Sequence, residues 1–173
     1  MRWPRRLAAA LLSLGLVTAC SPSNDPEARY AQNYADHEPL HVVGYPSTGS
    51  LRITQEALWR IADGAEEDLA GLATGDATAS EAQKTATNWI KSFQKGAVGK
   101  VSADFYGDGV DRQTVVLYFH DTKQVKELHV RLDGNAGEDG WRVVMNEPDP
   151  KQAATAPTWA PTAPGGLDSN IPN

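Results

Sequence analysis

The chain has 173 residues, with 16 basic and 22 acidic side chains and a single cysteine. One cysteine excludes an internal disulfide framework, so the fold must be held by a hydrophobic core. The excess of acid excludes electrostatic binding to nucleic acid. It grows if residues 1–19 are removed, because they carry three arginines and no acid; 13 basic and 22 acidic residues then give a net charge of −9.

The first twenty residues have the composition of a secretory leader. Three arginines precede an apolar run over residues 7–17, which is too short to span a membrane comfortably. The run ends in Leu16-Val17-Thr18-Ala19-Cys20, which resembles the lipobox of bacterial lipoproteins. This resemblance implies that residues 1–19 are a cleaved signal peptide and that the Cys20 thiol receives a diacylglyceryl group. The lipid would then tether the protein to the outer face of a membrane, with acyl chains such as palmitate as its membrane contact.

The segments that flank the middle of the chain show little periodicity. Residues 20–50 read as the lipidated cysteine and a tether, with one apolar patch at 40–45 that either forms a short strand or packs on the domain. Residues 148–173 hold six prolines among alanine, threonine and glycine. Such a composition buries too little apolar surface to offset its ordering entropy, which predicts a disordered tail.

Residues 51–147 carry the periodicity of a folded domain. From Thr54, a candidate cap, apolar residues at three- and four-residue spacing predict a helix that continues to Leu72. The sequence Ser80–Gln83 matches a capping box. The helix that it opens presents Trp89 and Phe93 on one face and is expected to stop at Gly96.

Strand patterns follow the two helices. Apolar residues alternate with polar ones in four segments, joined by short links rich in glycine and aspartate, which predicts an antiparallel meander of about four strands. The segment Thr114–Phe119 is β-branched and aromatic on both faces and is expected to be central. The fold class is therefore α+β, with two N-terminal helices on one face of a curved antiparallel sheet.

The acidic turn, tryptophan and last strand over 138–144 are similar to the ending of small secreted proteins of the cystatin-like and NTF2-like groups. This resemblance implies helices that cradle a bent sheet.

Two groups of residues could ligate metal. The loop with Asp104, Asp108 and Asp111 resembles the calcium loops of FG-GAP and dockerin repeats, but it lacks a closing glutamate. A plain hairpin turn is favoured, because aspartate and glycine suit tight turns. His37 and His41 are four apart, but Pro39 between them opposes a shared helical face, so zinc is not expected.

Catalytic patterns are few. The chain has no Gly-x-Ser-x-Gly elbow, and the acids near Asp63 are expected on a solvated helix face. His120 and His129 are expected at the surface, and the strand and helix aromatics in the core. The sequence favours a lipid-anchored binding or accessory module of the cell envelope, without enzymatic activity, cofactor or metal, whose partner is an envelope protein or a small ligand. A small-ligand enzyme of NTF2-like type and a structural role at the envelope surface are the alternatives.

Overall fold

The computed structural model describes residues 26–107 and 109–157. Cys20, Asp108 and residues 158–173 of the predicted tail lie outside these ranges. The helices are α1 (Pro26–Asp36), α2 (Thr48–Asp63), α3 (Glu66–Ala70), α4 (Ala79–Ala97), α5 (Pro150–Ala153) and the 3₁₀ helix η1 (Gly137–Gly140). The strands are β1 (His41–Gly44), β2 (Val101–Gly107), β3 (Arg112–Phe119), β4 (Gln124–Leu132) and β5 (Trp141–Val143).

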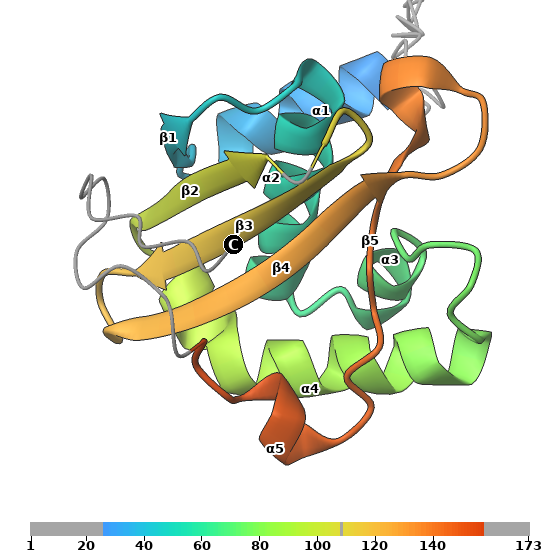
Figure 1. Ribbon diagram of the computed structural model, residues 1–173. Coiled ribbons are helices and arrows are strands. Elements are labelled where there is room, and N and C mark those ends of the chain that lie inside the picture. Colours follow the sequence, from blue (N-terminus) through green and yellow to red (C-terminus); the bar gives the residue numbers. More distant parts are fainter. Residues whose placement is uncertain (1–25, 108, 158–173) are drawn as a thin grey trace, which may run out of the picture.

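The strands form one open, mixed sheet in the order β1-β2-β3-β4-β5. The expected antiparallel strands are present as β2 to β5, and β3 is central as predicted. The predicted sheet of about four strands did not include β1, but the short strand that was one of the two alternatives for residues 40–45 is present. It pairs with β2 in parallel, placing His41 opposite Ser102. Parallel strands need a long crossover, and the chain from α2 to α4 supplies it on one face of the sheet (Figure 1).

The first predicted helix is two helices in the structure. α2 begins earlier than Thr54, because the Ser47 side chain caps it by accepting a hydrogen bond from Ser50 N. It ends at Gly64, whose φ of +69° is the left-handed conformation of a helix C-cap. The short α3 then carries the buried Leu69, which the predicted continuous helix would have placed on its apolar face.

The capping box of α4 lies two residues before the predicted one. Thr78 Oγ1 accepts from Glu81 N at 3.2 Å, and Glu81 Oε2 accepts from Thr78 N at 3.0 Å. Both candidate pairs have the required spacing of three residues. The pair observed places a carboxylate in the first turn, where the helix dipole favours it.

The folded part extends beyond 51–147 at both ends. α1 and β1 lie in the segment predicted to be a tether, and α5 lies at the start of the predicted tail. Aromatic contacts hold α1, since the rings of Tyr30 and His37 lie 5.3 and 5.4 Å from Trp59 of α2. In α5, Asp149 caps the helix and Ala153 is fully buried.

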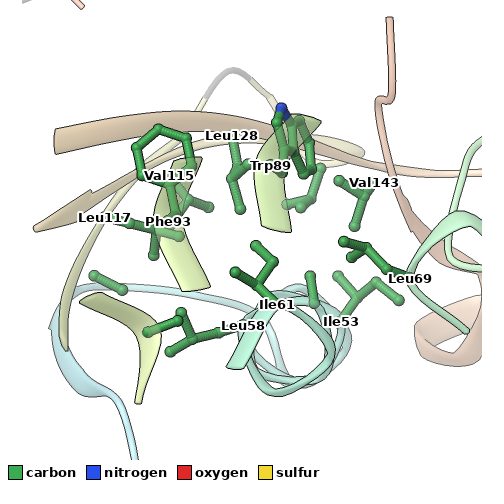
Figure 2. Packing of buried hydrophobic residues seen from close by; sticks show 14 of the residues in the cluster. Ile53, Leu58, Ile61, Leu69, Trp89, Phe93, Val115, Leu117, Leu128 and Val143 are labelled. Carbon is green, nitrogen blue, oxygen red and sulfur yellow. The ribbon is translucent and has the colours of Figure 1, made fainter. Parts of the chain in front are cut away.

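The core lies between the sheet and the helices α2 and α4 (Figure 2). Phe93 of α4 stacks on Phe119 of β3 with ring centroids 5.3 Å apart. The alternation predicted this inner face of the sheet correctly, because Val115, Leu117 and Leu128 all turn into the core. The aromatic residues assigned to the core are all buried: Trp89, Phe93, Phe105, Phe119 and Trp141.

Candidate anion-binding cleft

A cleft of about 600 Å³ opens between α1, α2 and the segment from η1 into β5. Its apolar lining residues are Ile53, Leu72 and Trp141, of which only Leu72 is half-buried, since Ile53 is 6% and Trp141 4% exposed. The polar lining residues are Glu27, Arg29, Tyr30, Asn33, Arg52, Glu56, Arg60, Glu138, Asp139 and Arg142. The cleft therefore combines an apolar surface with many charges.

α2 provides one long wall of the cleft. Gly49, Arg52, Glu56 and Arg60 recur every three or four residues and therefore share a helix face. Because the opposite face of α2 packs in the core, this row of charged residues is held in a fixed orientation.

The N-terminal end of α2 is joined to η1 at the edge of the cleft. Gly49 N donates to Glu138 Oε2 at 2.5 Å, so a carboxylate from η1 satisfies one of the free amides of the first helical turn. The backbones approach so closely that a Cβ at Gly49 would lie 2.1 Å from Glu138 O and 2.3 Å from Trp141 Cδ1. Only glycine fits there.

Arg52 engages most of the acidic residues of the cleft. Its guanidinium lies 2.7 Å from Glu27, 3.4 Å from Glu56 and 3.8 Å from Asp139. It also stacks over the Tyr30 ring, with Cζ 4.9 Å from the centroid. Burial lowers the pKa of Arg52, but its hydrogen bonds to Glu27 and Glu56 outweigh burial and raise it.

The other three arginines of the cleft are not neutralised by its carboxylates. Arg60 reaches only Asp63, at 3.8 Å, although its side chain is just 13% exposed. Arg142 donates to the backbone carbonyls of Asp139 and Trp141, each at 2.8 Å. Among the described residues no carboxylate lies within 4.0 Å of Arg29. Among the described residues, none of these three guanidinium groups is paired with a carboxylate that lines the cleft.

Most of the arginines of the chain after Cys20 lie in this cleft. Six arginines follow Cys20 in the chain, and four of them line this cleft. The spacing of Arg52 and Arg60 on one helix face was the only local signal for the cleft. Arg29 and Arg142 join them through the tertiary fold, which is why the sequence did not predict it.

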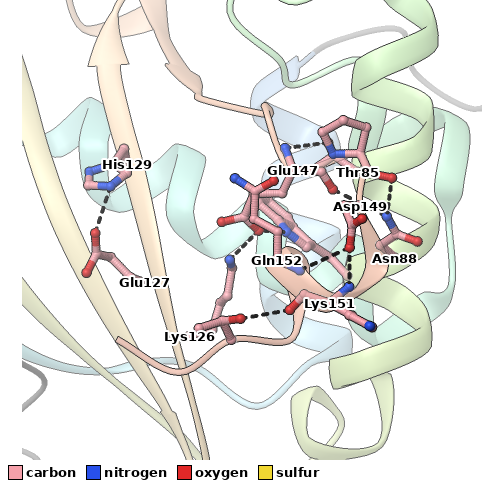
Figure 3. A network of polar contacts seen from close by, with 12 residues as sticks. Thr85, Asn88, Lys126, Glu127, His129, Glu147, Asp149, Lys151 and Gln152 are labelled. Atoms are coloured by element: carbon pink, nitrogen blue, oxygen red, sulfur yellow. Dashed lines mark hydrogen bonds and ion pairs between the residues drawn. The ribbon is translucent and has the colours of Figure 1, made fainter. Parts of the chain in front are cut away.

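A second polar cluster joins β4, α4 and the chain after β5 (Figure 3). Lys126 pairs with the Glu147 carboxylate, which also accepts from Trp89 Nε1 at 2.6 Å. Asn88 and Thr85 bind the backbone of the same segment. Burial lowers the pKa of Lys126, and Glu147 opposes that effect. Because Lys126 is buried and lines no part of the cleft, this cluster serves to hold the segment on α4.

The predicted metal-ligand candidates lie apart. Asp104 is in the middle of β2, opposite Val116, whereas Asp111 lies in the exposed loop before β3. His37 contacts Asn33 O and Asp63, while His41 lies on β1, near Ser102. Within the ranges that the structure describes, no three histidine, cysteine or acidic side chains are grouped to hold a metal ion.

The remaining histidines lie on the sheet. His129 is exposed and pairs with Glu127 at 2.7 Å, and His120 is partly exposed at the end of β3. His120 Nε2 lies 2.8 Å from Ser102 Oγ, but Ser102 is buried and lines no part of the cleft. Burial is the main cause that lowers the pKa of His120.

No protein family matches this chain, and comparisons with curated proteins and with solved structures found no match. None of the helices in residues 26–107 and 109–157 is long and apolar enough to cross a bilayer.

Proposed function

We propose that this protein is a lipid-anchored binding module on the outer face of a bacterial membrane, and that its cleft binds a small organic anion. The lipobox-like segment that ends at Cys20 supports the location. The cleft supports the activity, because it gathers four of the six arginines that follow Cys20 and leaves three of them without a cleft carboxylate.

The composition of the cleft defines the ligand. Guanidinium groups prefer planar oxyanions, to which they donate two parallel hydrogen bonds. The half-buried side chains of Leu72 and Tyr30 in the lining favour a ligand with a hydrophobic body. A carboxylate or sulfonate on an aromatic or aliphatic body of moderate size meets both requirements.

Binding without turnover fits the lining better than the enzymatic alternative. Among the described residues that line the cleft there is no histidine, cysteine, serine, threonine or lysine. It therefore offers no imidazole base beside a hydroxyl, thiol or amine nucleophile. Its carboxylates are already engaged by Arg52 and by the amide of Gly49.

Calorimetric titration with 2-naphthoate tests the proposal, because this probe carries one carboxylate on an apolar body. Arg60→Gln and Arg142→Gln should each weaken binding about tenfold or more, since a hydrogen bond to a charged group is worth about 1.5–3 kcal/mol. Arg112→Gln is the matched control, because Arg112 is exposed and outside the cleft. Inorganic phosphate, which has no apolar body, should bind more weakly. Equal affinity in all three variants would reject the cleft as the site.

A further inference from the structure

His37 lies behind the cleft, where the C-terminal end of α1 meets the C-terminal end of α2. Its ring stacks on Trp59 of α2, with the ring centroids 5.4 Å apart, and its side chain is only 16% exposed. His37 does not line the cleft. Its contacts nevertheless join two of the helices that form the cleft.

Both ring nitrogens of His37 face hydrogen-bond acceptors. Nδ1 lies 2.7 Å from the backbone oxygen of Asn33, and Nε2 lies 3.0 Å from Asp63 Oδ1. A carbonyl oxygen and an ionised carboxylate accept hydrogen bonds and cannot donate them, whereas a neutral imidazole has one N–H and the imidazolium has two. Both contacts are therefore hydrogen bonds only when His37 is protonated. Loss of the proton breaks one of the two.

These two hydrogen bonds fasten α1 to α2. α1 supplies Arg29, Tyr30 and Asn33 to the lining of the cleft, and α2 provides its long wall. Arg29 is one of the guanidinium groups that no cleft carboxylate pairs with, and Tyr30 is one of the half-buried side chains that suit an apolar ligand body. Deprotonation of His37 therefore weakens the attachment of a helix that carries part of the anion site.

The charge of His37 also acts on the cleft through Asp63. The second oxygen of this carboxylate, Oδ2, lies 3.8 Å from Arg60 Nη1, and Arg60 lines the cleft. When His37 is protonated, two cations share the carboxylate, and the three groups carry one net positive charge. When His37 is neutral, Arg60 is the only cation paired with Asp63 among the described residues, and the net charge is zero. Deprotonation therefore makes the cleft less attractive to an anion.

We infer that the cleft binds its anion in a pH-dependent way, tightly when His37 is protonated and more weakly when His37 is neutral. This inference rests on the proposed anion-binding function and adds a regulation of the same site. Burial lowers the pKa of His37, hydrogen bonds to Asp63 and Asn33 raise it overall, and the charge of Arg60 opposes the rise. Because the coupling between two binding events is reciprocal, a bound anion must raise the pKa of His37 further.

Calorimetric titration with 2-naphthoate at several pH values tests the inference, because a carboxylate of this kind stays ionised above a pH of about 6. The dissociation constant should be at least about threefold larger at a pH of about 9 than at about 6, since a unit charge about 10 Å away has an effect of this order. His37→Gln cannot titrate and should abolish the difference. His129→Gln is the matched control and should retain it, because His129 is exposed and pairs with Glu127 outside the cleft.

The titration of His37 itself gives an independent readout. Its pKa, followed by nuclear magnetic resonance of the imidazole, should rise when the protein is saturated with 2-naphthoate, and an equal pKa with and without the probe would overturn the inference. A dissociation constant that is the same at both pH values, or that changes equally in His37→Gln, would also overturn it while leaving the cleft as an anion site. Absence of naphthoate binding at every pH would instead reject the proposed function, and this inference with it. Circular dichroism checks that each variant is folded at both pH values.

Discussion

Glu147→Ala should destabilise the protein far more than an exposed ion pair would. The Lys126 side chain is only 3% exposed, and its ammonium has the Glu147 carboxylate as its ion-pair partner. Alanine leaves this charge buried without its counter-ion, which costs about 3–5 kcal/mol. The backbone contacts of residue 147 with Thr85 and Asn88 remain possible, so the loss should come from the side chain.

A double-mutant cycle, measured by urea unfolding, separates the cost of the unpaired Lys126 charge from the cost of the lost hydrogen bond to Trp89 Nε1. In a Lys126→Met background the same substitution removes only the acceptor of Trp89 Nε1 and should cost about 1–3 kcal/mol, the cost of an unsatisfied buried donor. Glu127→Ala is the matched control and should cost at most about 1 kcal/mol, because its partner His129 is half exposed. An equal cost of Glu147→Ala in both backgrounds would refute the coupling between Lys126 and Glu147.

Three further predictions concern α1, the cleft and the anchor. Burial lowers the pKa of His37, but hydrogen bonds to Asp63 and Asn33 raise it overall, so its protonated form stabilises the docking of α1. This stabilisation is complete below a pH of about 6.5 and is lost as pH rises through the raised pKa. The thermal unfolding midpoint should therefore fall over this pH range, and His37→Gln should reduce the fall. A pH dependence of the midpoint that is the same in His37→Gln would contradict the prediction. Gly49→Ala should cost about 1–3 kcal/mol through its clash with Glu138 and Trp141, while Gly75→Ala, whose Cβ would lie 3.3 Å from a flexible carboxylate, should be nearly neutral in the same urea assay. Cys20→Ala should abolish incorporation of labelled palmitate and release the protein from the membrane fraction or leave it uncleaved; unchanged membrane retention without any lipid would count against the lipobox.

The sequence predicted those parts of the fold that depend on local pattern. Strands β2 to β5 lie next to one another in both chain and sheet, so alternation and short turns were enough to place them. Strand β1 has only four residues and pairs in parallel with β2, and the helices α2, α3 and α4 separate the two strands in the sequence. α1 depends on rings that meet Trp59, a contact between distant residues that periodicity does not encode.

The predicted helix boundaries were wrong where two local signals in the sequence competed. The apolar spacing continues through Gly64, but the positive φ of this glycine ends α2 and separates α3. For α4, two pairs of residues had the capping spacing, and only the carboxylate of Glu81, which the helix dipole favours in the first turn, distinguished the observed pair from Ser80 and Gln83. The candidate cleft was hidden for a different reason, since Arg29 and Arg142 are far apart in the chain and meet only after α1 and β5 have docked around α2.

The binding of an organic anion by the cleft can be observed at the arginines themselves. Nuclear magnetic resonance of the Nε–H groups should be followed while 2-naphthoate is titrated into the protein. We expect the signals of Arg60 and Arg142 to shift together and to saturate, while the signal of the exposed Arg112 stays constant. Unchanged arginine signals at high naphthoate concentration, or a shift of Arg112 as large as those of Arg60 and Arg142, would contradict the account.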